Sequence, residues 1–168
     1  MNRFPVCFQH DSMLCGITCL LMICKYFGRD YTLESLSKIC FATTEGVSML
    51  GINEAARILG FQTVSARATI EELSEIPLPC ILHWNQNHFV VLYKMKKGKK
   101  FYIADPGKGK TTYNLEEFRR HWISTRSNDE DKGIAMFFET TPAFFTYQME
   151  GEDRQKEKRS FKFLFRYF

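Results

Sequence analysis

The chain has 168 residues, of which 45% are hydrophobic and 25% are charged, a balance typical of a single globular domain. Its net charge of +4 is mild and no long basic face accompanies it, which argues against a nucleic-acid-binding protein. Six cysteines are present, and the start of the chain lacks the apolar segment of a secretory signal, so we expect free thiols in a reducing compartment.

Helices dominate the first third of the chain. Apolar residues recur there at helical spacing, and Gly28 and Gly60 stand where left-handed caps would end two of the helices. The predicted helices run from Cys15 to Phe27, from Thr32 to Cys40 and from Ser48 to Leu59. Asp11 or Ser12 can cap the first helix, which places Cys15 in its first turn.

Strands dominate the remainder of the chain. Short runs rich in β-branched and aromatic residues predict strands at Phe61–Arg67, Cys80–Trp84, His88–Tyr93, Phe101–Asp105 and Gly133–Phe138. Two further helices are expected, a short acidic one opening at Thr69 and one from Leu115 to Trp122 capped by Asn114. Helices segregated before an antiparallel sheet describe an α+β fold.

Cys15 is the candidate nucleophile. At a helix N-terminus the unpaired amides and the helix dipole favour the thiolate, so we expect a thiol pKa below the free value of about 8.5. Gln9 lies upstream in the run Gln9-His10-Asp11-Ser12-Met13-Leu14-Cys15-Gly16, an arrangement by which many thiol hydrolases bring a nucleophile and an oxyanion donor together. The plainer alternative is a buried structural cysteine.

His88 and Asp105 are the candidate base and orienting carboxylate. In a hairpin closed at residues 96–100, His88 begins one strand and Asp105 ends the next, so the two lie close across the ladder. Each residue alone has a plainer interpretation, as a surface strand histidine and as a turn residue before Pro106. The chain order Cys, His, Asp is one that a catalytic triad permits.

Three short patterns together resemble one known family. The Cys15 segment, the strand starting at His88-Phe89-Val90-Val91 and the Asp105-Pro106 corner resemble the double-glycine leader peptidases. These are papain-like cysteine peptidase domains at the N-terminus of bacteriocin-exporting ABC transporters, and the resemblance covers residues 1 to about 140. It implies a papain-like α+β fold and assigns four roles: Cys15 as nucleophile, His88 as general acid and base, Asp105 as orienting residue and Gln9 as oxyanion donor.

The resemblance also implies a function. The domain would cleave the leader of a precursor peptide after a Gly-Gly pair, coupled in a longer protein to export. Its partners would be the precursor and the transmembrane and nucleotide-binding domains of a transporter, a homodimer at full length, at the cytoplasmic face of the bacterial inner membrane. No cofactor is expected for the peptidase, with ATP bound only by a nucleotide-binding domain outside this chain.

Leu14 is the one departure from the family pattern. The family commonly carries an acidic residue immediately before the nucleophile, whereas Asp11 matches the other acidic position of the motif. A catalytically silent leader-binding domain of the same fold is therefore an alternative function.

The domain organisation follows from composition. We predict a papain-like domain over residues 1–140, a charged linker over residues 141–159 and an interfacial segment over residues 160–168 that leads to a transmembrane domain outside this chain. The last segment is rich in phenylalanine but far shorter than the roughly 20 apolar residues that a spanning helix needs.

Two other kinds of site have partial signals. Residues 104–111 end in Gly-Lys-Thr and resemble a phosphate-binding loop, so a nucleotide-binding protein is a second alternative. A polar turn is the simpler interpretation, because the next helix begins only after Asn114. Cys7 and His10 have a ligand-like spacing, but no second pair completes a zinc set, and we expect no metal.

Overall fold

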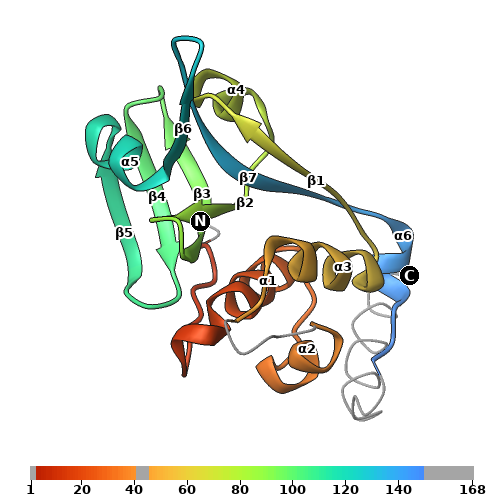
Figure 1. Ribbon diagram of the computed structural model, residues 1–168. Helices are drawn as coiled ribbons and strands as arrows, with labels where there is room; N and C mark the ends of the chain where they lie inside the picture. The colour runs from red at the N-terminus through yellow and green to blue at the C-terminus, as the bar shows by residue number, and fades with distance from the viewer. Residues whose placement is uncertain (1–2, 41–45, 150–168) are drawn as a thin grey trace.

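The computed structural model describes residues 3–40 and 46–149 (Figure 1). In chain order the elements are the 3-10 helix η1 (Ser12–Leu14), α1 (Cys15–Tyr26), α2 (Leu33–Ile39), α3 (Met49–Leu59), β1 (Phe61–Ala68), α4 (Ile70–Glu75), β2 (Cys80–Trp84), β3 (His88–Lys96), β4 (Lys100–Asp105), β5 (Gly109–Asn114), α5 (Leu115–Trp122), β6 (Ile123–Ser127), β7 (Glu130–Thr140) and α6 (Pro142–Thr146). The expected helices and strands are all present, with ends that differ by at most a few residues.

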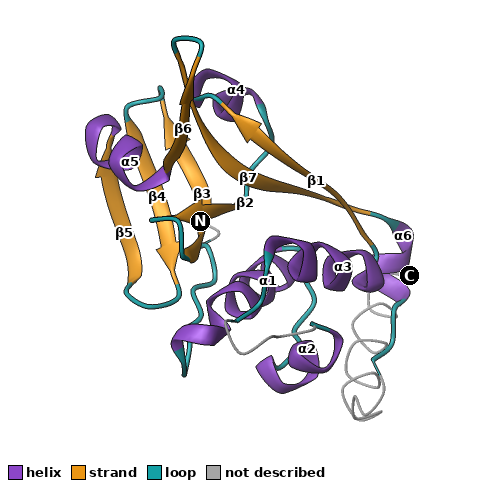
Figure 2. Cartoon of the chain, viewed as in Figure 1, coloured by secondary structure: helices purple, strands orange, loops and turns teal. Residues whose placement is uncertain are grey.

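One antiparallel sheet organises the molecule. Six of its seven strands follow the order β1-β7-β2-β3-β4-β5, and the seventh, β6, pairs with β7 away from this path. Helices α1, α2 and α3 are grouped together, apart from α4 and α5 (Figure 2). The expected α+β class is therefore confirmed.

The sheet separates two hydrophobic cores. Alternate residues of a strand point to opposite faces, so Val91 packs in the core under α1 to α3 while Val90 packs in the other core. In the second core Phe118 of α5 stacks on Phe101 of β4, with ring centroids 3.9 Å apart. Because α1 packs against the first face, its N-terminus lies near the start of β3.

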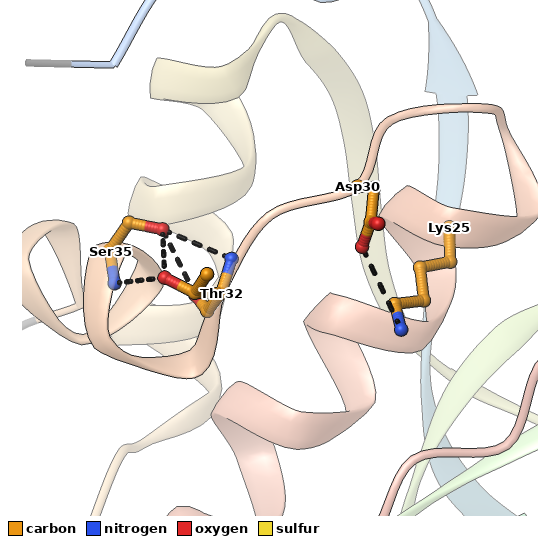
Figure 3. Close-up of polar contacts among 4 residues, drawn as sticks. All are labelled: Lys25, Asp30, Thr32 and Ser35. Carbon is orange, nitrogen blue, oxygen red and sulfur yellow. Dashed lines mark hydrogen bonds and ion pairs between the residues drawn. The ribbon is translucent and has the colours of Figure 1, made fainter. Parts of the chain in front are cut away.

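Most of the predicted helix caps are present, whereas α1 begins after Leu14 with no side-chain cap and Asp11 instead caps the 3-10 helix before it. Figure 3 shows the capping box of α2, in which Thr32 Oγ1 accepts from Ser35 N–H at 3.1 Å and the Thr32 amide donates to Ser35 Oγ at 3.2 Å. The same figure shows Lys25, in the last turn of α1, paired with Asp30 at 3.7 Å. These local contacts fix the short connection between α1 and α2.

The structure corrects the polar turn expected at residues 104–111. The turn occupies only Asp105 to Gly109, and β5 then pairs with β4 in the register Ile103↔Thr111 and Ala104↔Lys110. β5 is an edge strand with mostly polar side chains, so it lacks the apolar signal that predicts a buried strand. The sequence pattern missed β6 as well.

The structure also corrects the end of the domain, which was expected at residue 140. Residues 141–149 are packed rather than a linker, because α6 buries Phe144 completely. The Arg29 guanidinium donates to the carbonyl oxygens of Phe145 at 2.9 Å and of Tyr147 at 2.6 Å. A short helix with one buried aromatic residue was hidden by its position beside the charged run that follows it.

The remaining part of the predicted linker, residues 150–159, and the predicted interfacial segment, residues 160–168, lie outside the described residues. Within the described part of the chain, no helix has both the length and the apolar character needed to cross a bilayer.

Candidate active site

Cys15 is the first residue of α1. Asp11 caps the preceding 3-10 helix by accepting a hydrogen bond from Met13 N–H at 2.9 Å, and η1 then runs directly into α1. The residue itself is 7% exposed and has a free thiol. The expected position of Cys15 in the first helical turn is therefore confirmed.

His88 and Asp105 meet as the hairpin geometry predicts. His88 begins β3, Asp105 ends β4, and His88 Nε2 lies 2.8 Å from Asp105 Oδ1. The Gly107 amide donates to the same Oδ1 at 2.8 Å, which fixes the carboxylate. Because Asp105 occupies Nε2, the ring nitrogen left to face the thiol of Cys15 is Nδ1.

The three groups shift one another's pKa values. Burial of Asp105 raises the pKa of its carboxyl, but the hydrogen bonds from His88 and Gly107 outweigh burial and leave the pKa below its ordinary value. Burial of His88 lowers its pKa, while hydrogen bonds and charge from Asp105 and Cys15 raise it to about 9. A histidine with this pKa is protonated at neutral pH.

The thiol of Cys15 responds in the opposite direction. Burial raises its pKa, but a hydrogen bond from His88, a backbone hydrogen bond from Phe89 and the charge of His88 together bring the pKa below its ordinary value. The Gly16 amide of the first turn adds a smaller contribution of the same sign. A thiolate beside a protonated imidazole is the state that this arrangement favours.

Gln9 lies beside the corner that follows Asp105. Its backbone N–H donates to the Pro106 carbonyl oxygen at 2.9 Å. A Cβ atom on Gly107 would come within 3.3 Å of Asp105 Oδ1 and 3.7 Å of Gln9 Nε2, so both side chains lie beside Gly107. Gln9 Oε1 is buried and has no hydrogen-bond partner among the described residues.

The profile of the Peptidase C39 family matches residues 3–127. The chain belongs to this family. A colicin V secretion/processing ATP-binding protein of Escherichia coli is 36% identical over 121 residues, which cover 72% of this chain and 17% of that protein. A lactococcin-G-processing and transport ATP-binding protein of Lactococcus lactis subsp. lactis is 36% identical over 123 residues, which cover 70% of this chain and 17% of that protein. The chain thus spans less than a fifth of the length of these curated relatives.

Solved structures agree with the family assignment. A double glycine motif protease from an AMS/PCAT transporter, crystallised with the leader peptide, matches with a TM-score of 0.72 and 35% identity, covering 83% of this chain and 93% of that one. The peptidase domain of Streptococcus ComA matches with a TM-score of 0.69 and 25% identity, covering 83% and 100%. The papain-like α+β fold of a C39 domain is confirmed.

Leu14, the departure from the family pattern, has a structural place in this C39 domain. Its side chain is partly buried and packs against the core that contains α1. Its carbonyl oxygen accepts a hydrogen bond from Thr18 Oγ1 at 2.7 Å. The position therefore contributes packing to the start of α1, while Asp11 caps the 3-10 helix that precedes it.

The other candidate sites do not assemble in the C39 domain. Lys110 and Thr111 lie in β5 rather than at a helix N-terminus, so residues 104–111 do not form a phosphate-binding loop. Cys7 and His10 belong to no group of three or more metal-ligating side chains among the residues that the structure describes.

Two contacts of the site were missed from the sequence. The hydrogen bond from the Gly107 backbone N–H to the Asp105 carboxylate could have been predicted from the sequence. An aspartate often accepts from the backbone N–H two residues ahead, and Asp-Pro-Gly is a turn signal. The hydrogen bond from the Phe89 backbone N–H to the Cys15 sulfur had no signal in the sequence, because it joins distant segments and depends on how α1 packs on β3.

Proposed function

We propose that this C39 domain is a cysteine endopeptidase that cleaves the leader of a precursor peptide after a Gly-Gly pair. The observation that carries the proposal is the 2.8 Å contact between His88 and Asp105 beside a Cys15 thiol whose pKa is lowered. A nucleophile, a base and an orienting carboxylate within hydrogen-bond reach are what thiol-dependent acyl transfer requires.

The first half of the reaction forms an acyl-enzyme. The Cys15 thiolate attacks the scissile carbonyl carbon, and the Gln9 side-chain amide and the Cys15 backbone N–H stabilise the oxyanion that develops. Protonated His88 then donates its proton to the leaving amine as the peptide C–N bond breaks. The product is a thioester on Cys15 and a free amine.

The second half regenerates the thiolate. His88, now neutral, takes a proton from a water molecule that attacks the thioester carbonyl. The tetrahedral intermediate expels the Cys15 thiolate and releases the leader as a carboxylic acid. Asp105 holds the His88 ring in one orientation throughout and stabilises its protonated form.

The substrate and cellular setting of the proposal rest on relatives. Curated relatives are named for secretion, processing and transport of colicin V and lactococcin-G, and a structural neighbour is a double glycine motif protease bound to its leader peptide. We place this domain in a longer protein with transmembrane and nucleotide-binding domains, a homodimer at the cytoplasmic face of the bacterial inner membrane. The peptidase reaction needs no cofactor in this scheme.

A leader-binding domain without catalysis is the second candidate, favoured by Leu14. Its apolar side chain stands beside the nucleophile where the family commonly places an acid. Binding without cleavage is what this candidate predicts.

Mass spectrometry of the purified chain with candidate precursor peptides tests the two functions. We expect a single cut after Gly-Gly, lost in Cys15→Ala and His88→Ala and retained in Cys7→Ala, which removes a half-buried thiol elsewhere in the chain. Cleavage by Cys15→Ala would contradict the peptidase assignment. Leader binding without cleavage, measured by fluorescence anisotropy, would favour the second candidate.

A further inference from the structure

The turn before His88 holds two successive residues in the left-handed backbone region, which asparagine tolerates and glutamine does not favour. Trp84 ends β2 and pairs with His88 across a turn closed by a hydrogen bond from Asn87 N–H to Trp84 C=O at 3.2 Å. The two central residues, Asn85 and Gln86, have φ of 50° and 62°, in the left-handed region that favours glycine. Other residues persist there when surrounding contacts enforce the conformation.

Helix α5 supplies such contacts through His121. The backbone N–H of Asn85 donates to the His121 carbonyl oxygen at 2.9 Å, and His121 Nδ1 donates to the side-chain Oδ1 of Asn85 at 2.7 Å. The His121 ring also stacks on Trp84, with centroids 5.0 Å apart and an interplanar angle of 11°. One residue therefore holds the turn by its main chain, its side chain and its ring.

The support behind His121 is firmly packed. Phe118 and Trp122, on the same helix, are almost completely buried. Phe118 stacks on Phe101 of β4, and Trp122 Nε1 donates to the Ile134 carbonyl oxygen of β7 at 3.1 Å. Helix α5 is thus anchored to two strands of the sheet that presents the site.

We propose that the contact between Asn85 and His121 is a clamp that positions His88. Asp105 fixes the ring of His88. The clamp holds Asn85, three residues before His88 in the same turn, and so fixes the main chain that carries His88. A small displacement of the imidazole would weaken its hydrogen bond to Cys15, because such pairs depend on placement within a fraction of an ångström. His121 is therefore a positioning residue, an inference that rests on the proposed thiol–imidazole chemistry.

Two variants remove the side-chain hydrogen bond of the clamp in different ways and leave the main-chain bond from Asn85 N–H to His121 C=O in place. His121→Phe keeps an aromatic ring on Trp84 but loses the Nδ1 donor, and Asn85→Gly keeps a residue that tolerates positive φ but loses the acceptor. Asn128→Gly is the matched control, because Asn128 has φ of 52° at the same position of the β6–β7 turn. Any effect of glycine on a turn in general would appear equally in this control.

The measurement is the rate of Cys15 alkylation by iodoacetamide between about pH 5 and pH 10, followed by peptide mass spectrometry. We expect the two clamp variants to alkylate about 5- to 10-fold more slowly at neutral pH, with midpoints displaced toward the free thiol value of about 8.5. Half-buried Cys7 serves as an internal reference in each sample. The double variant should be no slower than the slower single variant, because both changes remove one contact.

Wild-type profiles in both clamp variants would overturn the proposal. So would an equal change in Asn128→Gly, or unfolded-like alkylation of all six cysteines, since either would mean a general effect on folding. The assay needs no peptide substrate, so its outcome is separate from the test of function. An unchanged profile in His88→Ala would instead refute the thiol–imidazole pair itself.

Discussion

At the scale of single residues, Cys15 owes the lowered pKa of its thiol to neighbours from other elements more than to its place on α1. Burial alone would raise the pKa of its thiol, and the hydrogen bond from His88 is the largest opposing contribution. The Gly16 amide of the helix start contributes less. The helix therefore places the sulfur, and the start of β3 lowers its pKa.

The pH dependence of cleavage should reflect the His88–Asp105 contact. His88 is protonated up to its pKa of about 9 in the folded protein, so kcat/KM should fall as pH rises through that value and the leaving amine loses its proton donor. Asp105→Asn removes the charge that raises this pKa, so the alkaline limb should move toward the ordinary histidine value of about 6.5. A pH–rate profile of both proteins checks this, and an unmoved alkaline limb would contradict it.

Gln9 should act on the rate and not on binding. Gln9→Ala removes one proposed oxyanion donor, which typically lowers kcat by about 100-fold or more. Peptide affinity, measured in the Cys15→Ala background, should stay unchanged because the donor acts on charge that develops in the transition state. Equal losses in affinity and kcat would assign Gln9 to substrate binding.

At the scale of elements, the junction between α3 and β1 depends on a glycine. Gly60 ends α3 with φ of +100°, and an added Cβ would lie 2.3 Å from the Phe144 amide nitrogen. Gly60→Ala should therefore lower the free energy of unfolding by about 2–3 kcal/mol, from backbone strain and overpacking. Gly28→Ala is the control, because its φ is +97° but the space around it is open, so only a strain cost of about 1–2 kcal/mol is expected. Urea denaturation of both variants measures the difference, and equal losses would contradict the packing argument.

The elements also show what a sequence pattern can and cannot predict. Caps at Ser48, Thr69 and Asn114 and the pairing of His88 with Asp105 follow from local signals, because caps and hairpins join residues close in the chain. β5 was missed because an edge strand buries little. The contact between Asn85 and His121 joins residues 36 positions apart, and no local pattern encodes it.

At the scale of the whole molecule, α6 completes the hydrophobic core beside β1. Phe144 is fully buried beside Phe61 of β1, with ring centroids 4.4 Å apart, so the packed domain needs residues beyond 140. Phe144→Ala should lower the free energy of unfolding by about 3–5 kcal/mol, the usual cost of a cavity of this size. The neighbouring Phe145 is 56% exposed, so Phe145→Ala should change the free energy of unfolding by no more than about 0.5 kcal/mol. Chemical denaturation compares the two, and similar stabilities would contradict the role of α6.

A Gly-Gly peptide chloromethyl ketone tests the central claim most directly, because the reagent requires both the nucleophile and recognition of the residues before the cut. The Cys15 sulfur displaces chloride and forms a thioether, which adds to the protein the mass of one inhibitor less one HCl. We expect a single adduct on Cys15, formed much more slowly in His88→Ala and when the terminal glycine of the reagent is replaced by alanine. Equal labelling in His88→Ala, or adducts on other cysteines, would contradict the assignment of Cys15 and His88 as the catalytic pair.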